Sequence, residues 1–312
     1  MKAVLPAMAR AMLGGRLHDL DVSWFASTEE AFAAAPEAEI GWLDMFDKVK
    51  MAEAIALAEK LNWLTSIYAG LDGFPLDRLA ERDVTLTNGK GINAIPVAEY
   101  AVMGMLAAAK RTDRIVRAHD KREWLGDAPG KLELYGSKAL ILGYGAIGQR
   151  IAQMLSGFEV EVTAVRRAPA GEPNVIGPDD WRPRLGEFDW VILAAPATDE
   201  TERMLGAAEF KAMKDSAWLV NIARGSLVDQ AALRSALSWG TIAGAFLDTV
   251  DPEPLPPDDP LWTAPNALIT MHLSGRAQTR MFERAVALFL DNLARYRAGK
   301  PLRNVVDLKL GY

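Results

Sequence analysis

A glycine-rich turn within residues 139–152, ALILGYGAIGQRIA, constrains the fold of this chain more than any other feature. An apolar run ends at Gly143, and Gly145 and Gly148 complete a G-x-G-x-x-G pattern just before a helical segment. The first glycine makes the tight turn, the second lets the backbone approach a pyrophosphate, and the third lets the helix pack closely on the strand. The helix N-terminus adds N–H groups and a positive dipole. The stretch predicts a dinucleotide-binding turn; the alternative is a glycine turn without a ligand.

Short apolar runs alternate with helical patterns along most of the chain, which favours parallel sheets with crossover helices. The expected strands are Lys2–Leu5, Glu39–Leu43, Trp63–Tyr68, Leu140–Leu142, Glu161–Val165, Trp190–Ala194, Trp218–Ile222, Ala243–Leu247 and Ala267–Met271. The last six are enough for one complete doubly wound sheet, and the first three predict a smaller sheet. We therefore expect an α/β fold with two doubly wound parallel-sheet domains.

The domain boundary is expected at the glycine-rich stretch NGKGIN, residues 88–93. A long helix is expected near the C-terminus, where apolar residues recur at helical spacing and glycine and proline follow. These residues are Phe282, Val286, Phe289, Leu293, Tyr296, Gly299 and Pro301. This helix follows the larger sheet and can return the chain to the first domain. We expect one domain of residues 1–92 and 276–312, a second of residues 93–275, and a cleft between them.

Composition excludes several function classes. The 312 residues carry a net charge of −6, so no overall basic field exists for nucleic acid or an anionic membrane. Half the residues are hydrophobic, but no run is long enough to span a bilayer. Cysteine is absent, which excludes disulfides, thiolate metal sites and cysteine nucleophiles. We expect a soluble cytoplasmic protein with no metal site.

The strand after the glycine turn lacks the acidic residue that accepts hydrogen bonds from the adenosine ribose in NAD-binding sites. It ends in VRRAP, so Arg166 stands about where the carboxylate is expected and Arg167 follows. A guanidinium can hold two oxygens of a 2′-phosphate at once. The pair therefore predicts NADP(H) in preference to NAD(H), which stays possible. The alternative is that both arginines are solvated surface residues.

One of the three histidines is placed for chemistry. His18 and His119 lie among charged or turn residues and are expected at the surface, whereas His272 follows the strand ending in ALIT. Hydride transfer to a carbonyl needs a proton donor that works near neutral pH, and imidazole suits this role. Arg224 and Glu253 follow the two preceding strands. Arg224 is the candidate cation for an acid substrate, and Glu253 is the candidate acidic partner of the imidazole. Taken singly, each has a plain explanation as an ion pair, a loop carboxylate or a strand-end histidine.

The order of these motifs resembles the D-isomer-specific 2-hydroxyacid dehydrogenases, a family that includes glyoxylate/hydroxypyruvate reductases, phosphoglycerate dehydrogenase and formate dehydrogenase. The resemblance covers almost the whole chain. It rests on TSIYAGLDG, GINAIPVAEYAV, GYGAIG, LVNIARGSLVDQAAL, FLDTVDPEPLPPDDPLWTAPNALITMH and NLARYRAGKPLRNVVD. It implies a Rossmann dinucleotide-binding domain, a smaller flavodoxin-like substrate domain, and a homodimer joined through the dinucleotide-binding domain. Two departures are TMH in place of the commoner TPH, and VRR in place of an acidic strand end.

The resemblance also implies residue roles in an oxidoreductase. Arg224 would orient a 2-oxo acid, His272 would protonate its carbonyl oxygen as hydride arrives, and Glu253 would hydrogen-bond the histidine and keep it charged. Backbone amides of Ala69 and Gly70 would hold the substrate carboxylate.

Further contacts are expected around the substrate and the cofactor. Tyr68 is a further candidate for substrate contact. Trp42, Met45 and Trp262 are candidates for a bulky pocket, although core packing explains any of these four equally well. Asp248 would bind the nicotinamide carboxamide, and Val97 would pack against the cofactor. The expected cofactor-binding set is Gly143, Tyr144, Gly145, Ala146, Ile147, Gly148, Arg166, Arg167, Ala195, Pro196, Thr201, Ile222, Ala223, Asp248 and Val97.

The resulting hypothesis is NADP(H)-dependent reduction of a 2-oxo acid to a D-2-hydroxy acid, with glyoxylate and hydroxypyruvate as candidate substrates. One alternative is an NAD-linked dehydrogenase that works in the oxidative direction. Another is a non-enzymatic dinucleotide-sensing protein, because some members of the family serve as transcriptional corepressors.

Overall fold

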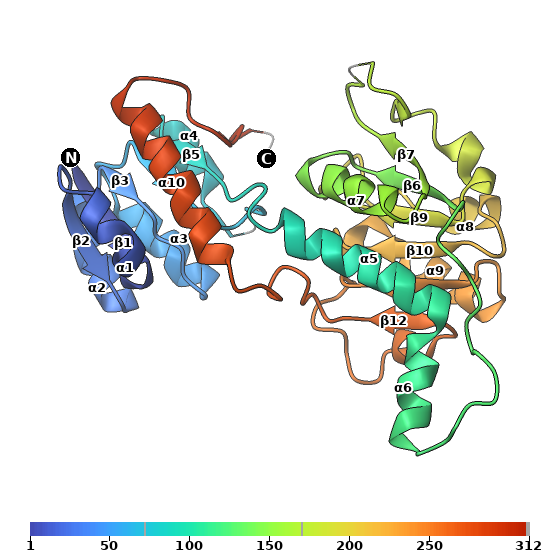
Figure 1. Cartoon of the computed structure of the whole chain (residues 1–312). Helices are drawn as coiled ribbons and strands as arrows, with labels where there is room; N and C mark the ends of the chain where they lie inside the picture. Colours follow the sequence, from blue (N-terminus) through green and yellow to red (C-terminus); the bar gives the residue numbers. More distant parts are fainter. Residues whose placement is uncertain (72, 170, 310–312) are drawn as a thin grey trace. The chain divides into compact units, whose positions relative to one another are not determined.

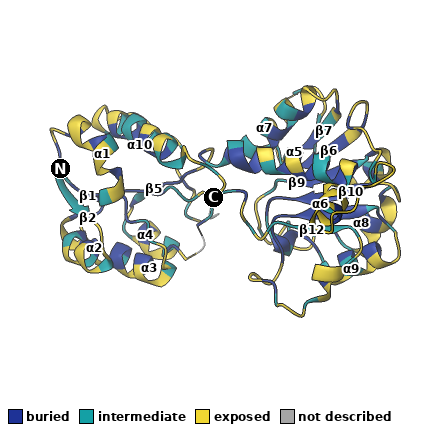
Figure 2. Cartoon of the chain, turned by 60° about the horizontal axis from the view of Figure 1, so that its bottom comes forward, coloured by how far each residue is buried: buried dark blue, intermediate teal, exposed yellow. Residues whose placement is uncertain are grey.

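The computed structural model describes residues 1–71, 73–169 and 171–309. The chain forms two compact units (Figure 1). Unit 1 contains Met1–Asn93 and the described residues from Gln278 onward, and unit 2 contains Ala94–Ala277. In both units most strands are buried, and the helices carry exposed residues on one side (Figure 2).

Unit 1 is built on a five-stranded parallel sheet. In chain order its strands are β1 (Lys2–Pro6), β2 (Asp21–Phe25), β3 (Ile40–Gly41), β4 (Trp63–Thr65) and β5 (Thr85–Thr87). The spatial order β2-β1-β3-β4-β5 is that of flavodoxin-like sheets. The expectation of a flavodoxin-like α/β unit is therefore confirmed.

Helices cover both faces of this sheet, because neighbouring strand residues point to opposite sides. On one face, α2 (Thr28–Ala34), α3 (Lys48–Leu57) and α4 (Leu76–Glu81) pack against Val4 and Leu64. On the other, α1 (Arg10–Leu13) and α10 (Met281–Arg297) pack against Ala3 and Leu5. Phe289 of α10 stacks on Trp63 with ring centroids 5.3 Å apart. The C-terminal helix thus completes the core of unit 1.

Two strands of unit 1 are absent from the sequence prediction. The sequence of β2, DVSWF, is interrupted by the polar residues Asp21 and Ser23, so it has no continuous apolar run, and only Phe25 is buried. The strand β5 is three residues long. The expected strand Trp63–Tyr68 is also too long, because β4 ends at Thr65 and a turn begins at Ser66.

Unit 2 is built on a seven-stranded parallel sheet in the order β12-β11-β10-β9-β6-β7-β8. In chain order the strands are β6 (Lys138–Leu142), β7 (Glu161–Val165), β8 (Val175–Ile176), β9 (Trp190–Leu193), β10 (Trp218–Asn221), β11 (Gly244–Leu247) and β12 (Ala267–Ile269). The six expected strands are present, and the two-residue β8 was not predicted. The order reverses between β6 and β9, the place where doubly wound sheets bind ligands. The Rossmann expectation is confirmed.

The sheet of unit 2 lies between two helical layers. On one face, α5 (Ala94–Lys110) and α7 (Ala146–Ser156) pack against residues such as Ile141 and Phe246. On the other, α8 (Ala207–Ala212) and α9 (Gln230–Ser238) pack against residues such as Leu140 and Leu219. The helix α6 (Thr112–Asp120) follows α5 and has one buried residue, Ala118. Among the described residues, no helix is both long and apolar enough to cross a membrane.

Gly104 lets α5 approach β11 closely. A Cβ at this position would lie 2.4 Å from ring carbons of Phe246. Alanine ordinarily stabilises a helix by about 1 kcal/mol relative to glycine, whereas overpacking a core costs about 1–3 kcal/mol. We therefore expect Gly104→Ala to lower the urea concentration at the midpoint of unfolding, measured by far-UV circular dichroism. Gly126→Ala is the control, because a Cβ there has no atom within 4 Å. A higher midpoint for Gly104→Ala would contradict the close packing.

Candidate active site

The glycine turn joins β6 to α7 and leaves no room for side chains at two positions. Gly143 has a φ of 108°, and its added Cβ would lie 2.5 Å from the carbonyl carbon of Ala194, which follows β9. At Gly148 a Cβ would lie 2.1 Å from the carbonyl oxygen of Gly143. Gly145 caps α7, and its added Cβ meets nothing within 4 Å. The turn therefore has the form that a dinucleotide pyrophosphate requires, with open space at the second glycine and a helix N-terminus beside it.

The other expected cofactor contacts lie on or beside this edge of the sheet. Tyr144, Ala146 and Ile147 are half-buried in the turn and the first turn of α7. Ala195 and Pro196 follow β9, Ile222 and Ala223 follow β10, and Val97 is buried on α5. The Thr201 hydroxyl donates to the carbonyl of Pro196 at 2.8 Å and accepts from the Thr198 amide at 2.8 Å. Thr201 therefore holds the loop after β9; the cofactor contacts themselves stay predictions.

Arg166 and Arg167 directly follow β7, and each is paired with a glutamate. Arg166 Nη1 lies 3.1 Å from Glu172 Oε1, and Arg167 Nη2 lies 2.8 Å from Glu200 Oε2. All four side chains are at least 41% exposed, and ion pairs with such exposure contribute about 0–1 kcal/mol. Each of these ion pairs is therefore weak. Glu172 Oε2 is buried without a hydrogen-bond partner among the described residues. The sequence interpretation missed both glutamates: Glu172 lies six residues after Arg166, and Glu200 lies 33 residues after Arg167.

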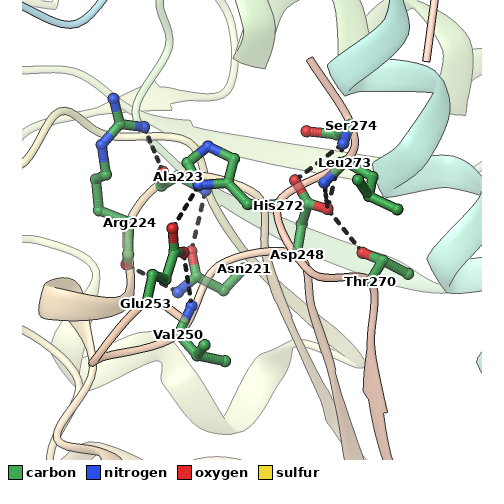
Figure 3. A network of polar contacts seen from close by, with 10 residues as sticks. All are labelled: Asn221, Ala223, Arg224, Asp248, Val250, Glu253, Thr270, His272, Leu273 and Ser274. Atoms are coloured by element: carbon green, nitrogen blue, oxygen red, sulfur yellow. Dashed lines mark hydrogen bonds and ion pairs between the residues drawn. The ribbon is translucent and has the colours of Figure 1, made fainter. Parts of the chain in front are cut away.

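The histidine and its acidic partner meet as expected. His272 Nδ1 lies 2.7 Å from Glu253 Oε2, and the other carboxylate oxygen accepts from the Val250 amide at 3.2 Å (Figure 3). Both side chains are about two-fifths exposed, which leaves the imidazole accessible. With Nδ1 donating to the carboxylate, Nε2 is the ring nitrogen available to a substrate. His18 and His119 are exposed.

The backbone around His272 has an unusual conformation that Asp248 stabilises. Met271 and His272 have φ values of 54° and 55°. Proline fixes φ near −65°, so the TMH sequence fits a backbone that proline could not adopt here. The buried Asp248 carboxylate accepts from the Thr270 hydroxyl at 2.7 Å and the Leu273 amide at 3.0 Å, and its carbonyl accepts from the His272 amide at 2.6 Å. Asp248 thus positions the histidine loop, and its contact with a nicotinamide carboxamide stays a prediction.

Arg224 lies beside the His272–Glu253 pair (Figure 3). Its Nη1 donates to the Ala223 carbonyl at 2.7 Å, and its own carbonyl accepts from Asn221 Nδ2 at 2.9 Å. The next residue, Gly225, approaches the loop that leads to Glu253, because an added Cβ would lie 2.0 Å from the carbonyl carbon of Val250. Sequence reasoning missed Asn221 and Gly225. The sequence signal for Asn221 was a polar residue at the end of an apolar strand, and the signal for Gly225 was a glycine directly after the arginine.

In unit 1, the turn after β4 contains the residues expected to hold a carboxylate. The Tyr68 carbonyl accepts from the Gly89 amide at 2.8 Å, and the Ala69 carbonyl accepts from Asn88 Nδ2 at 3.0 Å. Within the described ranges, the amides of Ala69 and Gly70 donate no hydrogen bond to another residue. The turn therefore offers two adjacent N–H groups. Two free backbone donors suit a carboxylate, which accepts charge-assisted hydrogen bonds.

The aromatic candidates divide between partly exposed positions and the core. Tyr68 is half-buried, donates to the Met45 carbonyl at 3.2 Å, and has Lys48 Nζ 3.0 Å above its ring. Trp42 is 2% exposed and packs on Phe289, so core packing explains it. Trp262 is 39% exposed, and its indole N–H donates to a loop carbonyl at 2.9 Å. In the part of the chain that is described, no group of three or more potential metal ligands occurs.

Comparisons with known proteins identify the family to which the chain belongs. Residues 102–274 match the model of the D-isomer specific 2-hydroxyacid dehydrogenase NAD-binding domain. A D-3-phosphoglycerate dehydrogenase of Archaeoglobus fulgidus is 31% identical over 93% of this chain, which spans 55% of that relative. A glyoxylate reductase of Korarchaeum cryptofilum is 33% identical over 82% of this chain and 79% of its own length. The crystal structure of a family member from Aeromonas salmonicida has a TM-score of 0.86 and 30% identity, and covers 98% of this chain and 99% of its own. The chain belongs to the D-isomer-specific 2-hydroxyacid dehydrogenase family.

Proposed function

We propose that this protein is an NADP(H)-preferring oxidoreductase that reduces a 2-oxo acid to a D-2-hydroxy acid. The single observation that carries the proposal is the 2.7 Å contact between His272 and Glu253, with Arg224 beside it, in the same unit as the glycine turn. This arrangement supplies a proton donor and a cation next to a dinucleotide-binding edge. Unit 2 is then the dinucleotide-binding domain, and unit 1 is the substrate domain.

The residues divide the chemistry among them. Arg224 attracts the 2-oxo acid and polarises its carbonyl. His272 Nε2 gives its proton to the carbonyl oxygen, while Glu253 holds Nδ1 and stabilises the imidazolium before transfer. The amides of Ala69 and Gly70 bind the substrate carboxylate. When bound, the reduced nicotinamide supplies the hydride that the carbonyl carbon accepts, so the product gains one hydride and one proton.

The preference for NADP(H) rests on the end of β7. No carboxylate occupies the strand end, and two guanidiniums follow it directly. A 2′-phosphate carries about −1.5 to −2 charges, so two guanidiniums at this position favour its binding.

A second candidate is an NAD-linked dehydrogenase working in the oxidative direction; Glu172 favours its cofactor and says nothing of its direction. Its buried Oε2 has no partner among the described residues and lies on the side chain that pairs with Arg166. The Glu172 side chain is 41% exposed, so its carboxylate could accept a ribose hydroxyl in place of the missing strand-end carboxylate. The corepressor alternative has no comparable observation in its favour.

Steady-state assays test the proposal. Absorbance of NADPH and NADH is followed separately with glyoxylate, hydroxypyruvate, pyruvate and phenylpyruvate. We expect turnover with at least one acid and a higher kcat/KM with NADPH. Equal or better rates with NADH would reject the cofactor preference, and no oxidation of either cofactor across the panel would reject the proposed enzymatic activity.

A cytoplasmic location stays a prediction.

We further propose a homodimer through unit 2. A hollow of about 580 Å³ lies on the surface of α5 and α7 and is lined by apolar side chains such as Val102, Leu106 and Phe158. The segment after α6 exposes large apolar residues, above all Trp124, which is 98% exposed. Exposed apolar patches mark interaction sites in folded proteins. A second copy of this segment is the occupant that we propose for the hollow.

Trp124→Ser is expected to shift the protein from dimer to monomer in sedimentation velocity at micromolar concentration, because buried interface tryptophans contribute about 2 kcal/mol or more. The control is Trp239→Ser, which removes another tryptophan of unit 2 that is 87% exposed but lies at the end of α9. A monomeric wild type, or equal effects of both substitutions, would contradict the proposed interface.

A further inference from the structure

Asp44 is a carboxylate of unit 1 that no proposed catalytic step uses. It lies in the loop between β3 and α3 and accepts three hydrogen bonds at 2.7–2.9 Å. Burial raises the pKa of its carboxyl, although the hydrogen bonds oppose this effect. A carboxylate that is taken out of water is costly unless its donors compensate. The three donors therefore indicate what this group holds in place.

Two of the three donors belong to the turn that leads to Ala69 and Gly70. Asp44 Oδ1 accepts from the Ser66 hydroxyl at 2.7 Å, and Oδ2 accepts from the Ile67 amide at 2.7 Å. Ser66 Oγ in turn accepts from the Tyr68 amide at 3.0 Å. One carboxylate thus fixes three successive residues of the turn, directly or through one hydroxyl. The contact joins segments about 22 residues apart in the chain.

The opposite side of the turn is held independently. The Ser66 amide donates to the Thr87 carbonyl at 2.9 Å, and the carbonyls of Tyr68 and Ala69 accept from Gly89 and Asn88. Gly89 comes so close that an added Cβ would lie 1.9 Å from the Ile67 carbonyl oxygen. The amides of residues 66–68 are therefore engaged. The next two amides remain available to a ligand, since they bond to no other described residue.

We infer that Asp44 is a positioning residue that presets the 66–70 turn so that its last two amides bind the substrate carboxylate. This inference rests on the proposed function of that turn. Without Asp44 the turn has to become ordered when the substrate binds. The conformational entropy lost on ordering its backbone then reduces the free energy of substrate binding. The effect falls on substrate affinity, because the hydrogen bonds of Asp44 all come from unit 1 and two of them hold the turn that contains Ala69 and Gly70.

The test compares Asp44→Asn and Ser66→Ala with Trp42→Phe. The first two remove parts of the link to the turn. Trp42→Phe removes the third donor of the same carboxylate, the indole N–H at 2.9 Å, and leaves the turn contacts intact. The measurements are KM and kcat for the 2-oxo acid that wild type reduces best, Kd for NADPH, and hydrogen–deuterium exchange of residues 66–70.

We expect KM to rise about tenfold in Asp44→Asn and Ser66→Ala, which corresponds to about 1.4 kcal/mol of binding free energy. We expect kcat and the NADPH Kd to stay within about twofold, and exchange in the turn to accelerate. Trp42→Phe should lower the unfolding midpoint and leave KM unchanged, because it removes only the hydrogen bond that Asp44 accepts from the core residue Trp42.

Two failures are distinguishable. A wild type that reduces no 2-oxo acid defeats the proposed function itself. An active wild type whose Asp44→Asn and Ser66→Ala variants keep the wild-type KM and the wild-type exchange of the turn defeats the role of Asp44. A rise in KM in Trp42→Phe as large as in Asp44→Asn also defeats it, since general loosening of the core would then explain the effect.

Discussion

Replacing His272 with asparagine is expected to lower kcat for 2-oxo acid reduction by about 10²–10⁴-fold, the usual contribution of a positioned general acid. Asparagine can donate a hydrogen bond but cannot transfer a proton at neutral pH. His272 is the histidine that Glu253 holds at 2.7 Å with its other ring nitrogen available, so no other described imidazole takes over. The NADPH Kd should stay near that of wild type, which separates lost chemistry from lost cofactor binding.

The control for His272→Asn is His119→Asn. This histidine lies on α6 with its side chain exposed, and its replacement should leave kcat unchanged. If His272→Asn keeps more than about a tenth of wild-type kcat, the general-acid role falls below the expected range and another donor must protonate the carbonyl.

Arg166→Asp is expected to reverse the cofactor preference. The variant loses a guanidinium that can hold the 2′-phosphate, and a hydrogen bond to a charged group contributes about 1.5–3 kcal/mol. The NADPH Kd should therefore rise about 10- to 100-fold. The new carboxylate repels the phosphate and can accept the ribose hydroxyls of NADH, whose Kd should stay level or fall. Isothermal titration with each reduced cofactor measures both values.

Two further variants make this result specific. Glu172→Gln removes the carboxylate 3.1 Å from Arg166, so it should tighten NADPH binding and leave NADH binding weaker or unchanged. Arg184→Asp makes the same charge change at an arginine paired with Glu187 at 2.9 Å and should alter neither Kd. An equal response of NADPH and NADH to Arg166→Asp would show that the arginine does not contact the 2′-phosphate.

Features with strong local signals could be predicted from the sequence. The glycine turn follows from three glycines at fixed spacing, and the structure shows the backbone contacts that require two of them. Because the carboxyl ends of parallel strands meet at one edge, Arg224, Glu253 and His272 could be brought together from their positions alone. The pairing of His272 with Glu253 is confirmed.

Features that depend on distant contacts could not be predicted. The strands β2, β5 and β8 contain no apolar run longer than two residues, so the sequence gives no clear strand signal there. The role of Asp44 depends on its contact with Ser66, which only the fold brings about, and Arg167 pairs with Glu200, 33 residues away in the chain. The left-handed backbone at Met271 likewise lies between two residues, Thr270 and His272, that donate hydrogen bonds to Asp248.

The central claim is that hydride reaches the carbonyl carbon of a 2-oxo acid on one face. The most direct measurement is turnover of hydroxypyruvate, pyruvate or phenylpyruvate with NADPH that carries deuterium at both C4 positions, followed by chiral separation and mass spectrometry of the product. The account predicts a D-2-hydroxy acid with one deuterium at C2 and unlabelled product from unlabelled NADPH. An L-2-hydroxy acid, or a product without deuterium, would contradict it.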